Sequence, residues 1–171
     1  MGVGVDALLK SANVARRSLY EDFGGKDGLI TEVLRRSTAQ DEATYKHTMQ
    51  AAGDDPRARL LAVFDGIAAF LDTPDFRGCR YLAADLALAD PDHPGHAITR
   101  EYRERVTRLL EHELLALGHL QPERAAHQIL LLIDGALAAG ATCPETHPAA
   151  AARQLAEQVL DTPRRPPRGK A

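Results

Sequence analysis

Two adjacent arginines, a tyrosine and a lysine are grouped near the start of the sequence, within "SANVARRSLYEDFGGKDGL", residues 11–29. An arginine can donate two hydrogen bonds to the O6 and N7 atoms of guanine, while tyrosine and lysine suit phosphate oxygens. On a helix, Arg16, Arg17 and Tyr20 share one face, because residues three and four apart are neighbours. Lys26 stands where a following helix should begin, and the free N–H groups there attract phosphate as well. The spacing is typical of a nucleic-acid contact. The alternative is a solvated helix face with incidental charges.

The elements that must hold these side chains are short helices. Apolar residues with helical spacing form two successive stripes: Val5, Leu8, Leu9 and Ala12, then Ala15, Leu19 and Phe23. Asn13 separates them and tolerates the left-handed conformation that ends a helix, and Gly24-Gly25 ends the second stripe. We expect the second stripe to face inwards. Two short helices joined by a tight turn form a helix-turn-helix, whose second helix enters the major groove.

Nearly all of the remaining sequence also has helical periodicity, and no useful length alternates with a period of two, so we predict an all-α fold. Asp55 is expected to cap a helix that has Pro56 in its first turn. The run "ILLLIDGALAAGA" is too short and too interrupted to span a membrane, and we expect a helix that is buried on most sides. The last helix is predicted from Pro148 to about Leu160.

Charge is distributed unevenly along the chain, although the net charge is only −3. Residues 1–50 hold seven basic and seven acidic residues, whereas residues 51–161 hold ten basic and seventeen acidic residues. An acidic body repels DNA, so any DNA contact belongs to the N-terminal part. Residues 162–171 carry four basic residues and no acid, and we predict a disordered basic tail.

The segment "VDALLKSANVARRSLYEDFGGKDGLITEVL" resembles the DNA-binding region of the TetR family of transcriptional repressors. The matching positions are Ala12, Val14, Ser18, Leu19, Tyr20, Phe23, Lys26 and Leu29, and they fall in register without a gap. The segments "FRGCRYLAADLALADPDHPGHAITREYRERV" and "LLLIDGALAAGA" resemble the ligand-binding domain of one branch of that family. The resemblance therefore covers most of the chain.

This resemblance implies a DNA-binding transcriptional regulator in the cytoplasm, a repressor released from a double-stranded DNA operator by a small-molecule effector. It places Arg16, Arg17 and Ser18 at the groove, Tyr20 on a phosphate and Lys26 on the DNA backbone. It also implies a helix-turn-helix domain at residues 1–45 and an effector-binding and dimerisation domain at residues 46–161.

The sequence departs from the family pattern at three places. Asn13 replaces the usual glycine of the turn, and Ala15 replaces the usual serine or threonine cap. That second change should weaken the recognition helix by about 0.5–2 kcal/mol. The family also has a helix before the first one here, where this sequence has only "MGVG". We expect a further segment to precede residue 1. A chain that truly starts at Met1 would instead favour a helical, dimeric effector-binding protein without DNA binding.

Ligand pockets are mostly apolar with a few polar groups. The candidates for the effector site are Phe64, Ile67, Leu71, Leu82, Asp85, Leu86, Tyr102, Val106 and Leu130. Among them, Asp85 is the polar candidate, on an otherwise apolar helix. For each of them an ordinary core role is the favoured alternative, and periodicity does not separate the two roles.

The resemblance further implies a homodimer. Small residues let helices approach closely, and the candidate dimer residues are Gly135, Ala136, Ala139, Gly140, Leu155, Ala156 and Val159. Two subunits would match the two half-sites of an operator. The alternative is that these residues only pack inside one subunit.

The sequence also bears on three other kinds of chemistry: metal binding, oxidant sensing and enzyme catalysis. Asp92, His93 and His96 could hold a zinc ion, or the histidines could simply cap the next helix. Cys79, between Arg77 and Arg80, could sense oxidants or be a small packed residue. The sequence has no Gly-rich phosphate loop, nucleophile elbow or HExxH motif, so we expect neither an enzyme nor a cofactor.

Overall fold

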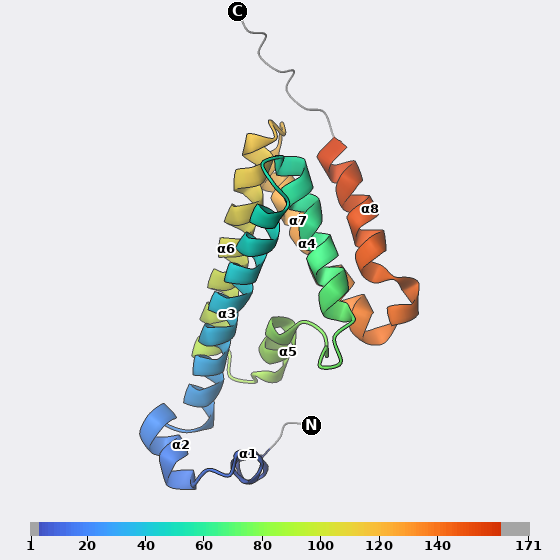
Figure 1. Ribbon diagram of the computed structural model, residues 1–171. Helices are drawn as coiled ribbons and strands as arrows, with labels where there is room; N and C mark the ends of the chain where they lie inside the picture. The colour runs from blue at the N-terminus through green and yellow to red at the C-terminus, as the bar shows by residue number, and fades with distance from the viewer. Residues whose placement is uncertain (1–3, 162–171) are drawn as a thin grey trace, which may run out of the picture. The chain divides into compact units, whose positions relative to one another are not determined.

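A computed structural model describes residues 4–161, and the expected basic tail lies outside the described residues. Within this range the chain is helical and contains no strand, which confirms the all-α prediction (Figure 1). The helices are α1 (Val5–Ala12), α2 (Arg16–Phe23), α3 (Lys26–Ala51), α4 (Pro56–Leu71), α5 (Arg80–Ala87), α6 (Pro94–Ala116), α7 (Pro122–Thr142) and α8 (Pro148–Asp161), with a 3₁₀ turn, η1 (Pro144–Thr146), before α8.

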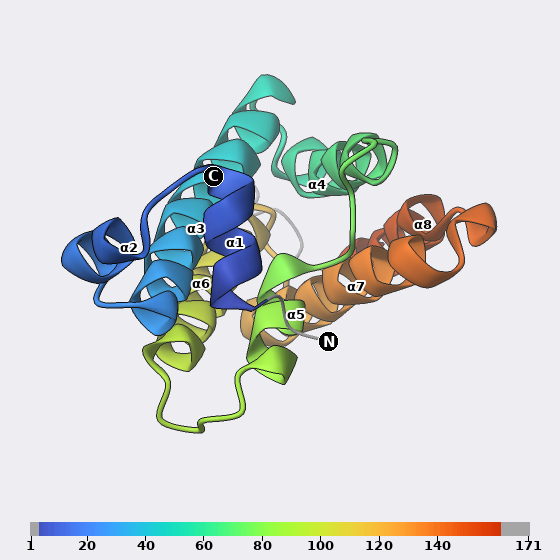
Figure 2. The same cartoon turned by 90° about the horizontal axis from the view of Figure 1, so that it is seen from below.

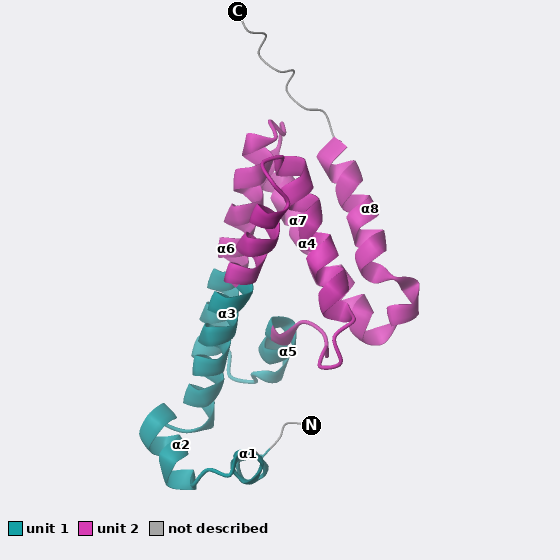
Figure 3. Cartoon of the chain, viewed as in Figure 1, with its two compact units in different colours: residues 1–41, 81–102 teal, residues 42–80, 103–171 magenta. Residues whose placement is uncertain are grey.

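The chain divides into two compact units (Figure 3). Unit 1 comprises residues 1–41 and 81–102, and therefore joins the two N-terminal helices to α5 and the start of α6. Unit 2 comprises residues 42–80 and 103–171 and contains α4, α7 and α8. The domain limits expected from the sequence, near residue 45, stay a prediction.

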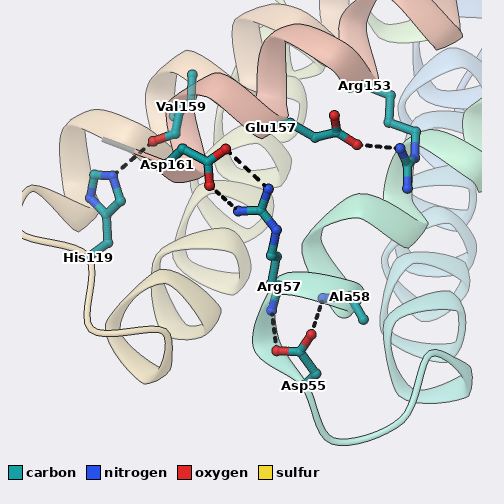
Figure 4. Close-up of polar contacts among 8 residues, drawn as sticks. All are labelled: Asp55, Arg57, Ala58, His119, Arg153, Glu157, Val159 and Asp161. Carbon is teal, nitrogen blue, oxygen red and sulfur yellow. Dashed lines mark hydrogen bonds and ion pairs between the residues drawn. The ribbon is translucent and has the colours of Figure 1, made fainter. Parts of the chain in front are cut away.

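The local signals in the sequence place the helix ends correctly. Asn13 is left-handed, with φ 52°, and ends α1, while Gly24 with φ 70° ends α2. Asp55 caps α4, and its carboxylate accepts hydrogen bonds from the N–H groups of Arg57 at 3.1 Å and Ala58 at 3.2 Å (Figure 4). Ala15, as expected, gives α2 no side-chain cap. These ends are encoded locally, so sequence reasoning finds them.

Unit 2 is built on close packing between α4, α7 and α8. Large side chains of this unit are fully buried, among them Leu60, Phe64, Leu110, Leu114, Ile129, Ile133 and Leu160. Gly140 on α7 lies against Leu71 on α4, so closely that a Cβ there would lie 2.6 Å from Leu71 Cδ2. Glycine at this position therefore lets the two helices approach.

Helix α7 is buried on one face and not on most sides, so that prediction is wrong. Ala126, Ile129 and Ile133 are buried, whereas Leu131 is 70% exposed. Among the described residues, α7 is the one helix long and apolar enough to cross a membrane. The core helix of a soluble protein passes the same test of length and composition. Helix α7 therefore packs against the rest of unit 2 through one face, and the chain leaves apolar residues on the opposite face uncovered.

Polar contacts close one end of unit 2 (Figure 4). Arg57 donates to Asp161 at 2.7 Å and so holds the end of α8 to the start of α4. His119 accepts the N–H of Gln121 on Nδ1, so its Nε2 carries the proton and donates to the carbonyl of Val159 at 3.1 Å. These contacts fix the ends of helices whose middles are packed through apolar side chains.

Candidate nucleic-acid interface

Helices α1 and α2 form the helix-turn-helix expected from the sequence, and α2 leads directly into α3 (Figure 2). The turn is closed by the N–H of Val14, which donates to the carbonyl of Leu9 at 3.1 Å. Gly24 and Gly25, with φ of 70° and 119°, form the next turn. Because both have positive φ, residues with side chains would be strained there.

The inward face of α2 is smaller than the sequence predicts. Leu19 is buried and Phe23 is half-buried, as expected. Ala15 is exposed, so its expected inward orientation is wrong. The reason is its position: Ala15 precedes the first turn of α2 in an extended conformation, with φ −71° and ψ 144°, and does not follow the helical stripe.

The candidate DNA contacts lie at the start of α2 and the start of α3. Arg16 and Arg17 are the first two residues of α2, and both are exposed, as are Tyr20 and Lys26, while Ser18 is half-buried. The ring of Tyr20 packs over Gly25, where a Cβ would lie 3.3 Å from Tyr20 Cε1. This packing holds Tyr20 beside the turn that leads to Lys26. The positive end of the α2 dipole adds to the charge of the two arginines.

Sequence reasoning missed a glycine that sets the geometry of this site. A Cβ at Gly28 would lie 1.7 Å from the carbonyl oxygen of Phe23. Gly28 is in the first turn of α3 and Phe23 ends α2, so only glycine permits this approach between the two helices. The sequence offered one signal, a glycine inside a helix, where it normally costs stability.

Sequence reasoning also missed the partners of the two arginines. Arg16 donates from Nη2 to Asp6 Oδ1 on α1, and Arg17 donates from Nε to Glu21 Oε1 at 2.6 Å. The hydrogen bond to Asp6, together with the attraction between the two charges, raises the pKa of Arg16 above its ordinary value. Both arginines therefore carry a carboxylate beside them in the free protein.

Helix α5 and the start of α6 contact α3 within unit 1. Tyr81 donates from its hydroxyl to Asp41 Oδ2 at 2.6 Å, and its ring lies 4.4 Å from that of Tyr102. A Cβ on Gly95 would lie 3.2 Å from Leu34 Cδ1, so the backbone of Gly95 is close to Leu34. These contacts tie the α5–α6 segment to the helix that begins with Lys26.

His93 caps the start of α6, whereas His96 lies within the first turn of α6 and has other partners. His93 Nδ1 accepts the N–H of Gly95 at 2.9 Å, and its Nε2 lies 3.8 Å from Asp27 Oδ1. His96 Nδ1 instead pairs with Asp85 Oδ1 at 2.8 Å. Over residues 4–161 there is no group of three or more His, Cys, Asp or Glu side chains that could hold a metal ion.

The candidate effector residues divide between the two units. In unit 1, Tyr102 is buried, Asp85 is half-buried, and Leu82 and Leu86 are 47% and 80% exposed. The alternative that Leu82 and Leu86 are ordinary core residues is therefore wrong. In unit 2 the candidates are packed side chains: Phe64, Ile67, Val106 and Leu130 are buried, and Leu71 is half-buried.

The candidate dimer residues also separate into two groups. Ala136, Gly140 and Ala156 are buried inside the single chain, and Ala139 and Val159 are half-buried. Gly135 and Leu155 are exposed, and a Cβ at Gly135 would have no neighbour within 4 Å. The exposed pair and Leu131 are among the uncovered small and apolar positions of α7 and α8.

Cys79 is half-buried, and one of the arginines beside it is engaged elsewhere. Arg77 donates from Nη1 to the backbone carbonyls of Pro74 at 2.8 Å and Phe76 at 2.7 Å. Its guanidinium therefore holds the loop before α5, and this arginine gives no specific support to an oxidant-sensing thiol at Cys79.

Comparisons with known proteins agree with this architecture. No protein-family model matches the chain. The chain is 32% identical over 166 residues to the HTH-type transcriptional regulator BetI of Vibrio campbellii. The match covers 92% of this chain and 79% of the relative. It is 30% identical to BetI of Burkholderia mallei, over 94% of this chain and 82% of the relative.

Solved structures have the same fold. A TetR-family transcriptional regulator from Streptomyces coelicolor superposes with a TM-score of 0.80 and 29% identity, over 92% of this chain and 83% of that one. NemR of E. coli, in its reduced form, shares the fold with a TM-score of 0.78 at 20% identity. Helix-turn-helix geometry, near-complete coverage and these relatives give one conclusion: the chain belongs to the TetR family of transcriptional regulators and is not an enzyme.

Proposed function

We propose that the protein binds a double-stranded DNA operator through α2 and the start of α3, as a cytoplasmic homodimer, and represses transcription until a small-molecule effector releases it. One observation carries the DNA-binding part. Arg16, Arg17, Tyr20 and Lys26 are exposed together on a short helix and the turn that follows it. The close approach of Gly28 to Phe23 fixes that turn.

Release by an effector needs a mechanical link between the sensing region and the DNA contacts. Within unit 1, Tyr81 and Gly95 connect α5 and α6 to α3 through Asp41 and Leu34. A ligand that binds one arrangement of α5 better than another shifts α3 with it, because its differential affinity sets the population of the two states. Movement of α3 moves Lys26 and the α2–α3 turn.

The exposed side of α5 favours an apolar effector. Leu82 and Leu86 lie one helical turn apart, and both remain uncovered in the described chain. Asp85 stands between them and accepts hydrogen bonds from Thr99 at 2.9 Å and from His96. An apolar ligand with one polar group suits this arrangement.

The uncovered apolar side of α7 and α8 supports the homodimer. Leu131, Gly135 and Leu155 are exposed there. Gly135 provides room for a partner helix to approach. If this side forms the dimer interface, Gly135→Ala should raise the dimer dissociation constant in sedimentation experiments. An unchanged dissociation constant would place the interface elsewhere.

The DNA-binding part can be tested directly. The wild-type protein selects sequences from a randomised 26-bp library, and anisotropy then gives its affinity for the enriched duplex and for a shuffled one. Arg17→Ala and Lys26→Ala should weaken binding and flatten its salt dependence, by about one unit for each phosphate interaction that the substitution removes. Arg108→Ala is the matched control, since Arg108 is an exposed arginine of α6 in unit 2. A wild-type protein that enriches no sequence contradicts the proposal and favours an effector-binding protein without DNA binding.

A further inference from the structure

His93 carries a hydrogen-bond donor that is buried without a partner. Its side chain is 5% exposed, and its Nδ1 accepts the N–H of Gly95 at 2.9 Å, so the ring proton is on Nε2. Within residues 4–161, Nε2 forms no hydrogen bond. Buried polar groups are almost always paired, because an unpaired donor has lost its hydration and gained nothing. The ring is therefore placed to donate to an acceptor that it does not yet reach.

The carboxylate of Asp27 is such an acceptor. His93 Nε2 lies 3.8 Å from Asp27 Oδ1, beyond the range of about 2.7–3.2 Å for an N–H···O hydrogen bond. The side chain of Asp27 is 79% exposed, so water hydrates its carboxylate in the free protein. Both residues belong to unit 1, and Asp27 is in the first turn of α3. A rotation of this side chain, or a shift of about 1 Å, forms the hydrogen bond.

Bound DNA favours that hydrogen bond. Asp27 directly follows Lys26, the candidate contact to the DNA backbone. A phosphate held by Lys26 lies within a Debye length of Asp27, about 10 Å at 0.1 M salt, and repels its carboxylate. Turning towards His93 gives the repelled carboxylate a charge-assisted hydrogen bond in exchange for water.

Resting on the DNA-binding function proposed above, we propose that His93 is a positioning residue for DNA binding. When a phosphate reaches Lys26, His93 donates from Nε2 to Asp27 and holds the carboxylate away from that phosphate. His93 thereby offsets a repulsion that Asp27 would otherwise add to DNA binding.

This role ties DNA affinity to the position of the α5–α6 segment. His93 is fixed to the backbone of Gly95, where a Cβ would lie 2.7 Å from Leu88 Cδ1 and 3.2 Å from Leu34 Cδ1. The segment is thus packed closely against α3 next to the ring. By linkage, bound DNA holds the segment in this position, and a ligand that moves the segment weakens DNA binding.

Asparagine separates this role of His93 from its role as a cap. Asparagine is a preferred N-cap residue, and its side-chain oxygen can accept the N–H of Gly95 in place of Nδ1. Its shorter side chain does not extend to the position of Nε2. His93→Asn therefore keeps the cap of α6 and removes the donor to Asp27.

The experiment uses the full chain and the enriched duplex defined above. Anisotropy at about 0.1 M salt gives the DNA affinity of the wild-type protein, His93→Asn, Asp27→Asn and the double variant. Asp22 provides the control background: it is exposed on α2 and forms no ion pair among residues 4–161. His93→Asn is therefore also measured together with Asp22→Asn. Urea titrations give the stability of the same proteins without DNA.

His93→Asn should weaken binding about tenfold, the lower end of what a hydrogen bond to a charged group contributes. Asp27→Asn removes the repelled charge and should tighten binding. In the Asp27→Asn background, His93→Asn should change the affinity by less than about twofold, because no charge remains to be positioned. In the Asp22→Asn background, the tenfold loss should remain. The two substitutions should be additive in the stability of the free protein, where the hydrogen bond is absent.

Three results overturn the inference. If His93→Asn leaves the affinity unchanged, Nε2 has no part in DNA binding. If the losses are equal in the wild-type and Asp27→Asn backgrounds, His93 acts through packing alone. If the two substitutions are coupled as strongly in the free protein, the hydrogen bond exists before DNA arrives. In each of these cases the wild-type protein still selects a sequence, so the DNA-binding proposal stands. A wild-type protein that enriches no sequence overturns that proposal and this inference with it.

Discussion

Replacing Gly28 by alanine tests whether the geometry of the α2–α3 turn controls DNA binding. The added Cβ would lie 1.7 Å from the carbonyl oxygen of Phe23, and ordinary contact begins at 3.4 Å. The clashing atom belongs to the backbone and cannot rotate away. Either α2 or α3 must therefore move by more than an ångström.

The magnitude follows from the clash. Overpacking costs about 1–3 kcal/mol, and a clash with backbone belongs at the upper end of that range. The advantage of alanine over glycine in a helix, about 1 kcal/mol, acts on folding and is the same in both arrangements of the turn. The cost of restoring the native turn in Gly28→Ala is then about 3 kcal/mol. If DNA requires the native turn, affinity for the enriched duplex should fall on the order of 100-fold, since 1.4 kcal/mol is a factor of ten.

Gly140→Ala provides the matched control. Its Cβ would lie 2.6 Å from Leu71 Cδ2, which is the flexible end of a side chain in unit 2. This variant should lower the melting temperature and leave the affinity of the folded protein for DNA unchanged. Anisotropy measured well below the melting temperatures of both variants compares the DNA affinities of the folded proteins. The reasoning fails if Gly28→Ala binds the enriched duplex as tightly as the wild-type protein, or if Gly140→Ala weakens binding equally.

Three further substitutions should change stability. Ala15→Ser supplies the missing cap of α2 and should raise the free energy of unfolding by about 0.5–2 kcal/mol, whereas Asp55→Ala removes the cap of α4 and should lower it by a similar amount; urea titrations at constant protein concentration measure both. Lys46, and with it Arg105, holds the pKa of Glu42 below its ordinary value of 4.5. The resulting stabilisation is present in full above that value and is lost as the pH falls through the lowered pKa. Glu42→Gln should therefore be less stable than the wild-type protein near pH 7, and the difference should narrow as the pH falls below 4.5, in titrations at several pH values. A constant difference across the range would contradict this assignment.

The helices and their ends could be predicted because their signals are local. Asn13, Gly24 and Asp55 act on the few residues around them, and the structure places helix ends at all three. The exposure of side chains on those helices could not be predicted as well. Leu131 and Leu86 fit the apolar periodicity yet remain open, because periodicity shows which face is apolar and not what covers it.

The sequence predicted which residues are candidate DNA contacts, but not which side chains they are paired with in the free protein. Arg16 and Arg17 followed from their spacing, whereas the carboxylates paired with them did not. Asp6 reaches Arg16 across ten residues of chain, and only the relative placement of α1 and α2 brings the two side chains together. The requirement for Gly28 likewise comes from the approach of two helices and not from α3 itself.

Ion pairing in the free protein also distinguishes the roles of Lys26 and Arg16. Lys26 is exposed and forms no ion pair in the described part of the chain, whereas Arg16 is paired with Asp6. Lys26 is therefore already available to any phosphate, and Arg16 becomes available only after Asp6 is displaced. Lys26→Ala should weaken binding to the enriched and shuffled duplexes by similar factors and flatten both salt slopes by about 0.9. Arg16→Ala should weaken binding to the enriched duplex much more than to the shuffled one. Anisotropy on the same two duplexes measures the affinity of both variants. If Arg16→Ala and Lys26→Ala lose the same affinity for the shuffled duplex, Asp6 does not restrain Arg16 in the free protein.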